Sequence, residues 1–275
     1  MKNKVLVVIF AIIFTVTILT GCGGNNTPTS DTDASEVSQE SIENTIVGSK
    51  WIPVEVDGQP MLTNQKLVYD FTSKTEALIS GSSYGNESAI WSHYTKADVV
   101  INGNTITITS SPTEHMTVEQ QDSVISIEPN EFIVDSIGKI TSDGKDIHSA
   151  ETPSKFRFVK INEDYSKDIV GLWEGSCTSE GSVFDDGQEH RWEYKEDGTY
   201  AYYVKEGDNW VPSDNTLNEY FVAGNLLCTR WIEGGEENRE WWEVTIDDNT
   251  MSWTALRADE NGENYTATFE MKKVE

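Results

Sequence analysis

The sequence predicts an all-β protein built from two tandem antiparallel up-and-down β-barrels. Three observations predict this fold class. Apolar and polar residues alternate with a period of two, turn residues recur at short intervals, and one pattern of strands occurs twice along the chain. No segment keeps a sustained period of 3.6, so helix is expected to be a minor component. A β-sandwich is the alternative, and we favour the barrel because closure alone removes exposed sheet edges.

The N-terminus is typical of an exported protein. A basic start precedes an apolar run from Val5 to Leu19, and small residues follow it. This run of about 15 residues is shorter than the roughly 20 that a membrane-spanning helix needs. Its end, Leu-Thr-Gly-Cys at residues 19–22, resembles the lipobox of bacterial lipoprotein precursors. The resemblance implies that residues 1–21 are a lipoprotein signal peptide and that Cys22 carries lipid such as palmitate. The mature chain would then lie on the extracytoplasmic side of the cell membrane or outer membrane.

Residues 22–45 are expected to form a flexible tether. Gly, Asn, Thr, Ser and Asp dominate its first half, and no apolar periodicity is present. Such a composition cannot bury a core. A random coil of about 22 residues reaches roughly 25 Å, so the folded part would stand clear of the membrane.

The folded part is predicted to consist of two similar domains. Ile-Val-Gly followed closely by Trp occurs near residue 46 and again at residue 169, and each copy ends in an alternating strand with a Lys. Each copy has about 105 to 115 residues, an ordinary domain size. The predicted domains are residues 46–162 and 169–275.

Alternating segments within each copy predict half-buried strands. Trp192 and Tyr194 precede a turn at residues 196–198, and Tyr200 and Tyr202 follow it, which is typical of a β-hairpin. About seven or eight short strands per copy fit a barrel or a sandwich.

Two motifs in the second copy connect it to a known family. Residues 171–173, Gly-Leu-Trp, are similar to the Gly-x-Trp that opens the first strand of lipocalins and other calycin barrels. Residues 192–200 look like the hairpin between the second and third strands of bacterial lipocalin-like lipoproteins. In that family a basic residue of the last strand covers the Trp and closes the barrel floor. The resemblance implies such barrel-closing pairs here, Trp173 with Lys273 and Trp51 with Lys160. Residues 48–51 contain one residue too many for the motif, which indicates a bulge or a shifted strand start.

Composition argues against several function classes. The net charge is −27, and a surface this acidic repels phosphate backbones, so no nucleic acid partner is expected and membrane attachment must come from the lipid. The four histidines lack metal-site spacings, and no phosphate loop or nucleophile elbow occurs. We therefore expect no enzymatic activity, no cofactor and no metal site.

The tryptophans indicate where a ligand would bind. Seven of the nine lie in the second copy. Trp241 and Trp242 are adjacent, so they cannot face the same side of a strand, and one is expected to be exposed or to cover another element. Arg257 has the parity of Trp253 and is expected either at the barrel mouth, as a counter-ion for an acidic ligand, or in a surface salt bridge. Plain core packing is the alternative for the aromatic residues. The ligand-pocket candidates are Trp192, Tyr202, Trp242, Trp253, Arg257 and Tyr265.

Two cysteines remain besides Cys22. An exported pair can form a disulfide, but Cys177 lies on the first strand of its copy and Cys228 on about the fifth, across a barrel. Because a bridge needs Cα atoms within about 7 Å, two separate buried thiols are favoured.

Two functions of different class follow. The first is a lipid-anchored binding protein of the cell envelope that holds a small apolar or amphipathic ligand in its second barrel. The second is a structural or protein-interaction module whose barrels are filled by side chains. The size of the internal cavity distinguishes them, since eight strands can either fill completely or hold one small ligand.

Overall fold

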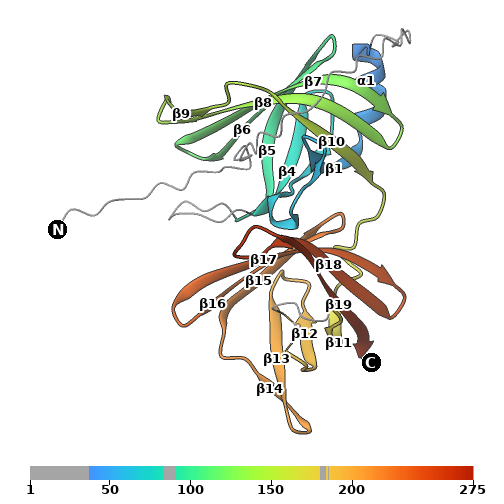
Figure 1. The fold of residues 1–275 in the computed structure, drawn as a ribbon, viewed down its shortest axis with the longest axis vertical. Coiled ribbons are helices and arrows are strands. Elements are labelled where there is room, and N and C mark those ends of the chain that lie inside the picture. The colour runs from blue at the N-terminus through green and yellow to red at the C-terminus, as the bar shows by residue number, and fades with distance from the viewer. Residues whose placement is uncertain (1–36, 83–90, 180–183, 185, 275) are drawn as a thin grey trace, which may run out of the picture.

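The computed structural model describes residues 37–82, 91–179, 184 and 186–274, which form two β-barrels in sequence (Figure 1). Within those ranges the chain is all-β except for helix α1 (Gln39–Ile46) and a single 3-10 turn, η1 (Thr63–Gln65). The predicted fold class, tandem antiparallel barrels, is confirmed. The signal peptide and Cys22 lie outside the described residues.

The first barrel closes completely through its last strand. Strand β10 pairs with β8 on one side and with β1 on the other, so that eight antiparallel strands form a ring. Short strands β2 and β9 pair with β1 and β8 outside this ring. The strands are β1 (Ser49–Val56), β2 (Gln59–Pro60), β3 (Val68–Phe71), β4 (Glu76–Ser82), β5 (Trp91–Asn102), β6 (Thr105–Thr113), β7 (Met116–Glu128), β8 (Glu131–Ser142), β9 (Lys145–Ser149) and β10 (Ser154–Ile161).

Helix α1 corrects the expected extent of the tether, because residues 39–46 belong to the folded part. Its N-cap is Ser38, whose hydroxyl accepts a hydrogen bond from the Ser41 amide. Ile42 and Ile46 are fully buried in the core of the first barrel. These two apolar residues lie four apart, a spacing that places them on one helix face. The helix was not predicted from the sequence because two helical turns are too short to establish a period.

The start of β1 also refines an expectation. Gly48 has φ +75°, a conformation that favours glycine, and its amide donates to the Phe71 carbonyl at 2.6 Å. The extra residue of the first copy therefore belongs to the turn between α1 and β1. The register of β1 against β10 shifts farther along, between Pro53 and Glu55.

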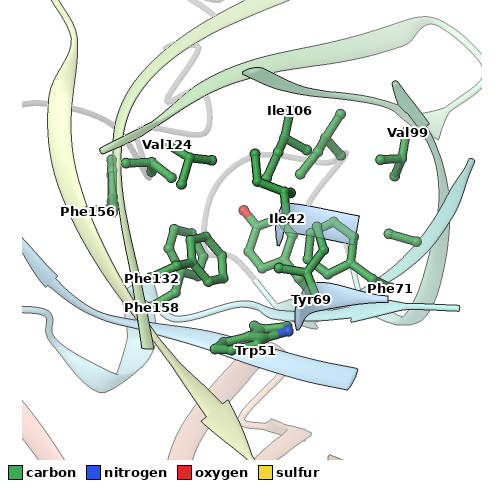
Figure 2. Close-up of a cluster of buried hydrophobic side chains, with 14 of the residues drawn as sticks. Ile42, Trp51, Tyr69, Phe71, Val99, Ile106, Val124, Phe132, Phe156 and Phe158 are labelled. Carbon is green, nitrogen blue, oxygen red and sulfur yellow. The ribbon is translucent and has the colours of Figure 1, made fainter. Parts of the chain in front are cut away.

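The interior of the first barrel is filled by phenylalanines and aliphatic residues (Figure 2). Phe132 and Phe158 stack with ring centroids 4.6 Å apart, and Trp51 meets Phe132 edge-on at 4.9 Å. Figure 2 shows Ile42 of α1 among these side chains. The helix thus contributes directly to the core.

The second barrel is a curled sheet that closes only partly. Its strand order is β14-β13-β12-β11-β19-β18-β17-β16-β15, and the edges meet at one bridge, between Thr199 and Glu219. Strand β13 pairs with β14 and not with β15. The hairpin of β13 and β14 projects at the lower end of Figure 1. The strands are β11 (Gly171–Cys177), β12 (His190–Tyr194), β13 (Tyr200–Glu206), β14 (Asn209–Pro212), β15 (Thr216–Ala223), β16 (Leu226–Glu233), β17 (Glu236–Asp247), β18 (Thr250–Ala258) and β19 (Asn264–Val274).

A third apolar cluster joins the two barrels. It contains Ile52, Val68 and Ile161 of the first barrel with residues of β15, β16 and β17, among them Trp241. Lys66 forms an ion pair with Glu243, and the Thr63 hydroxyl accepts a hydrogen bond from the Leu256 amide at 2.9 Å. The two domains therefore share a buried contact.

The adjacent tryptophans divide between two cores. Trp242 lies in the core of the second barrel, and Trp241 lies in the cluster between the barrels, each with 1 % of its surface exposed. Trp241 therefore covers another element, one of the two outcomes expected from the sequence. Cys228 is buried in the same cluster and Cys177 is half-buried in the other barrel, so the expectation of separate thiols is confirmed, although only Cys228 is fully buried.

Candidate ligand pocket in the second barrel

The second barrel contains a cavity of about 660 Å³. It lies between the two edges of the curled sheet. At this seam β13 pairs with β14 and does not form a ladder with β15. Its walls come from β12, β13, β14, β16, β17, β18 and β19. The lining residues are Phe184, Asp186, His190, Trp192, Tyr200, Tyr202, Val204, Glu206, Val211, Pro212, Ser213, Asp214, Asn215, Thr229, Trp231, Glu233, Glu240, Trp242, Trp253 and Phe269.

Aromatic rings form the inner wall of this pocket. The Trp192 ring centroid lies 4.7 Å from that of Trp253 and 5.4 Å from that of Tyr202. Trp242 lies 5.5 Å from both Trp253 and Phe269. Each of these residues comes from a different strand, at a position whose side chain points to the inner face of the sheet. The wall is therefore a continuous surface of indole and phenyl rings.

A histidine, a tyrosine and a carboxylate are linked at one side of the pocket. His190 Nδ1 lies 2.8 Å from the Tyr202 hydroxyl, and His190 Nε2 lies 3.1 Å from an oxygen of Asp186. Burial, reinforced by the negative charge of Asp186, raises the pKa of Tyr202 to about 12. The Tyr202 hydroxyl is thus neutral at physiological pH and can donate to the imidazole when Nδ1 is unprotonated.

Glu240 places a half-buried carboxylate in the pocket. It lies on β17 two residues before Trp242, whose indole Nε1 donates to it at 3.0 Å. Burial raises the pKa of Glu240, and the positive charge of Arg257 and the indole hydrogen bond oppose that rise. A carboxylate removed from water in this way interacts strongly with any charge that enters.

The six sequence-predicted pocket residues divide into two groups. Trp192, Tyr202, Trp242 and Trp253 line the pocket. Arg257 and Tyr265 do not: they lie opposite each other on β18 and β19, and Tyr265 packs against the core. Their contacts agree with the inward face that parity predicted, but both lie close to the end of their strands, outside the lining of the pocket.

Arg257 contacts aromatic rings instead of reaching the mouth of the pocket. Its guanidinium carbon lies 4.5 Å from the ring centroid of Trp242 and 4.9 Å from that of Phe184. One of its nitrogens donates to the Trp241 carbonyl at 3.3 Å. The guanidinium therefore packs against the aromatic wall of the pocket. This position differs from the two expected from the sequence, a counter-ion at the mouth and a surface salt bridge.

The barrel-closing pairs implied by the lipocalin resemblance differ between the two copies. Both are in register, Trp173 opposite Lys273 and Trp51 opposite Lys160. Lys273 Nζ lies 5.1 Å from the Trp173 ring centroid, while the ring contact of Trp51 is with Phe132.

Gly171 explains the first residue of the Gly-x-Trp motif. A Cβ at this position would lie 2.7 Å from Lys273 Cε, and its φ is +135°. The backbone conformation therefore favours glycine, and a side chain here would also displace the end of Lys273. Trp173 donates its Nε1 hydrogen to the Ile169 carbonyl at 2.7 Å, which fixes the indole over this floor.

A space inside the first barrel is far smaller than this pocket. The space next to Tyr69, Phe156 and Phe158 measures about 30 Å³, roughly the volume of one water molecule. Asp122 is buried here and accepts from the Gln120 amide at 2.9 Å. Burial raises the pKa of Asp122 to about 6.

The sequence analysis missed several lining residues, chiefly His190, Tyr200 and Glu240. Strand position was the available signal. His190 lies two residues before Trp192, and Glu240 lies two residues before Trp242, so each shares the face of its tryptophan. A carboxylate at an inward position is unusual enough to mark a site. The abundance of carboxylates in this acidic chain hid that signal.

Comparisons with known proteins do not assign a family. No family model and no curated protein matches the sequence. Among solved structures, two of transferrin binding protein B from Haemophilus parasuis Hp5, described as a vaccine antigen, show a likeness: one double mutant and one single mutant. Both have 8 % identity and a TM-score of 0.23, and they cover 78 % and 82 % of this chain. The chain spans only 61 % and 63 % of their lengths, and a TM-score this low supports no inference about function.

Two features are absent from the described residues. Among them, no helix is long and apolar enough to cross a membrane. No group of three or more His, Cys, Asp or Glu side chains in the described ranges is arranged to hold a metal ion.

Proposed function

We propose that this chain is a lipid-anchored bacterial lipoprotein on the extracytoplasmic side of its membrane, and that its second barrel binds a small amphipathic ligand. The first barrel serves as a filled companion domain, and the role is binding without catalysis. The observation that carries the proposal is the contrast in cavity volume, about 660 Å³ against about 30 Å³, between two barrels of one chain.

The pocket has the size and chemistry of a small-molecule site. Ligand sites measure about 300–1,000 Å³ and combine apolar walls with a few polar groups. The wall of Trp192, Trp242 and Trp253 supplies apolar surface, and the linked His190, Tyr202 and Asp186 supply polar contacts. Because the rim is open to solvent and the floor is buried, an amphipathic ligand fits better than a wholly apolar one.

Ligand binding is tested with a chain that begins at residue 23 and so keeps every described residue. Titration with uncharged and charged amphiphiles should quench the intrinsic tryptophan fluorescence saturably, with one molecule bound per chain. Thr229→Phe adds a ring to a lining position and should abolish quenching, whereas Thr245→Phe, on the exposed face of β17, should leave it unchanged. Native mass spectrometry of protein from its own cells should detect a retained small molecule.

The result that would overturn the binding function is equally clear. If no compound quenches and no molecule is retained, the second barrel is not a carrier. The protein-interaction alternative would then be the better reading.

The anchor is tested separately through Cys22. Cys22→Ser should leave the precursor unacylated and uncleaved, because the residue that resembles the lipobox cysteine is gone. Metabolic labelling with palmitate measures this. Normal labelling of the variant would overturn the lipoprotein assignment.

A further inference from the structure

The acidic side chains that line the pocket have no basic counterpart among the described lining residues. Four exposed carboxylates lie at the rim, and Glu240 lies inside; no Lys or Arg is among the described lining residues. Arg257, the nearest candidate for a counter-ion, contacts Trp242, Phe184 and the Trp241 carbonyl instead. An anionic ligand would therefore meet repulsion from these carboxylates, and the positive charge of Arg257 is already engaged with two rings and with Glu240. The rim residues are Asp186, Glu206, Asp214 and Glu233.

The aromatic wall adds an independent preference. The faces of indole rings carry negative electrostatic potential, and a cation within about 6 Å of a ring centroid is attracted to it. The ring centroids of Trp192 and Trp253 lie 4.7 Å apart, so one small cation can approach both rings, whereas the Trp242 ring already carries the Arg257 guanidinium. Several aromatic faces around one space are the arrangement that recognises ammonium groups.

Two acceptors inside the pocket suit the same kind of group. Glu240 offers a carboxylate that accepts from Trp242, and it retains further acceptor capacity because each ionised oxygen has two lone pairs. Asn215 lines the pocket, and its side-chain oxygen is buried without a hydrogen-bond partner among the described residues. A buried acceptor without a donor is costly, and an N–H group of a ligand would satisfy it.

We propose that the pocket selects ligands in which a positively charged nitrogen, a quaternary ammonium or a protonated amine, is attached to an apolar body. This inference rests on the proposed ligand-binding function and names its ligand class. The apolar body lies along the tryptophan wall, and the cationic group lies near Glu240.

The neighbouring tyrosines do not compete for the cation as anions. Burial raises the pKa of Tyr200 and of Tyr202, so both hydroxyls stay neutral at physiological pH. Glu240 is then the carboxylate inside the pocket that the cation meets, while the rim carboxylates attract it from solution. The net charge of −27 acts in the same direction at long range.

The test compares three probes of equal chain length that differ in the head group: decyltrimethylammonium, decanol and decanoate. Binding to the chain that begins at residue 23 is measured by tryptophan fluorescence and isothermal titration calorimetry. The ammonium probe should bind about tenfold tighter than decanol, which corresponds to about 1.4 kcal/mol of binding free energy. Decanoate should bind more weakly than either.

Matched variants separate the pocket from the general acidity of the surface. Glu240→Gln should weaken the ammonium probe about tenfold and leave decanol unchanged, because only a charged head group loses its partner. Glu270→Gln removes one charge from the exposed face of β19 and should change neither affinity. Thermal unfolding followed by circular dichroism confirms that both variants are folded.

The outcomes distinguish the two levels of the proposal. Equal affinity for the three probes, or tightest binding of decanoate, overturns the cationic preference and leaves a ligand-binding barrel. Equal weakening by Glu270→Gln and Glu240→Gln also overturns it, since binding would then follow surface charge. If none of the three probes and no compound of the wider panel binds, the ligand-binding function itself fails.

Discussion

The two barrels follow related strand patterns, yet one is filled and the other is hollow. In the first, β10 pairs with both β8 and β1 and completes the ring, and α1 adds Ile42 and Ile46 to the core. In the second, β13 pairs with β14, and in the described part of the chain the sheet edges meet at the isolated bridge between Thr199 and Glu219 and at the hydrogen bond from the Tyr220 amide to the Gly198 carbonyl. The comparison teaches that closure of the last seam, as well as strand number, decides whether a barrel has room for a ligand.

Side-chain shape explains why the second cavity does not collapse. Phenylalanines and aliphatic residues interlock in the first barrel, with Phe132 and Phe158 stacked at 4.6 Å. The second barrel packs large, flat rings such as Trp192 and Trp253 against each other at 4.7 Å, and these rings are held by further aromatic neighbours. Such a wall can border an open cavity, because each ring also packs against other aromatic rings.

The largest expected effect concerns the contact between the barrels. Trp241→Ala should lower the free energy of unfolding by about 3–5 kcal/mol, because the indole is buried in the cluster that joins the domains. Urea unfolding followed by circular dichroism measures the loss. Trp210→Ala, at a half-buried position on β14, should cost about 0.5–1 kcal/mol, mainly the stacking of Arg191 on its ring.

This pair also tests whether the predicted domains are independent. If Trp241→Ala leaves unfolding unchanged, the joining cluster contributes nothing and the barrels are stable separately. If it lowers the midpoint of a single cooperative transition, the two barrels unfold as one unit.

The next effect is confined to the filled barrel. Ile42→Ala should cost about 2–5 kcal/mol, because it opens a cavity where α1 enters the core. Val100→Ala, at a position with 61 % of its surface exposed, should change stability by less than about 0.5 kcal/mol. Ligand affinity measured by calorimetry should stay unchanged in both variants. A loss of affinity in Ile42→Ala would mean that the filled barrel supports the hollow one.

These contrasts show how much the sequence could specify. Alternation with turns predicted the strands and the tandem barrels, and the positions of three tryptophans and one tyrosine predicted four residues of the pocket wall. Neither α1 nor the departure of β14 could be predicted: two helical turns carry too little periodicity, and a hairpin leaves the same alternating pattern whether it joins the ring or leaves it. Parity gave the face on which Arg257 lies, but it could not give the rings of Phe184 and Trp242 that its guanidinium contacts.

A smaller effect concerns the pH dependence of the hollow barrel. Cation binding needs Glu240 ionised, so affinity is full above the pKa of that carboxyl and falls as the pH drops through it. Because burial raises this pKa, the fall should begin at a higher pH than for an ordinary glutamate. Glu240 also interacts electrostatically with Arg257 and with three tyrosines, Tyr194, Tyr200 and Tyr202. Of these four groups, only Arg257 is charged at acidic pH.

Decyltrimethylammonium is the appropriate probe because its own charge does not change with pH. Calorimetry across acidic pH should show affinity decreasing on acidification, and Glu240→Gln should flatten that part of the profile. His190 and the rim carboxylates remain in the variant, so a profile that is unchanged by Glu240→Gln would assign the dependence to those groups.

The smallest expected effect is at the barrel floors, where the two copies place a Lys opposite a Trp. Lys273 Nζ lies 5.1 Å from the Trp173 ring, and its stem occupies the space that Gly171 leaves open. Lys273→Ala should therefore cost about 0.5–1 kcal/mol in urea unfolding, through loss of the cation–π contact. Lys160→Ala should cost less, because Trp51 makes its ring contact with Phe132. Equal costs for the two variants would show that both floors are closed in the same way, and that the difference between the barrels lies wholly at their seams.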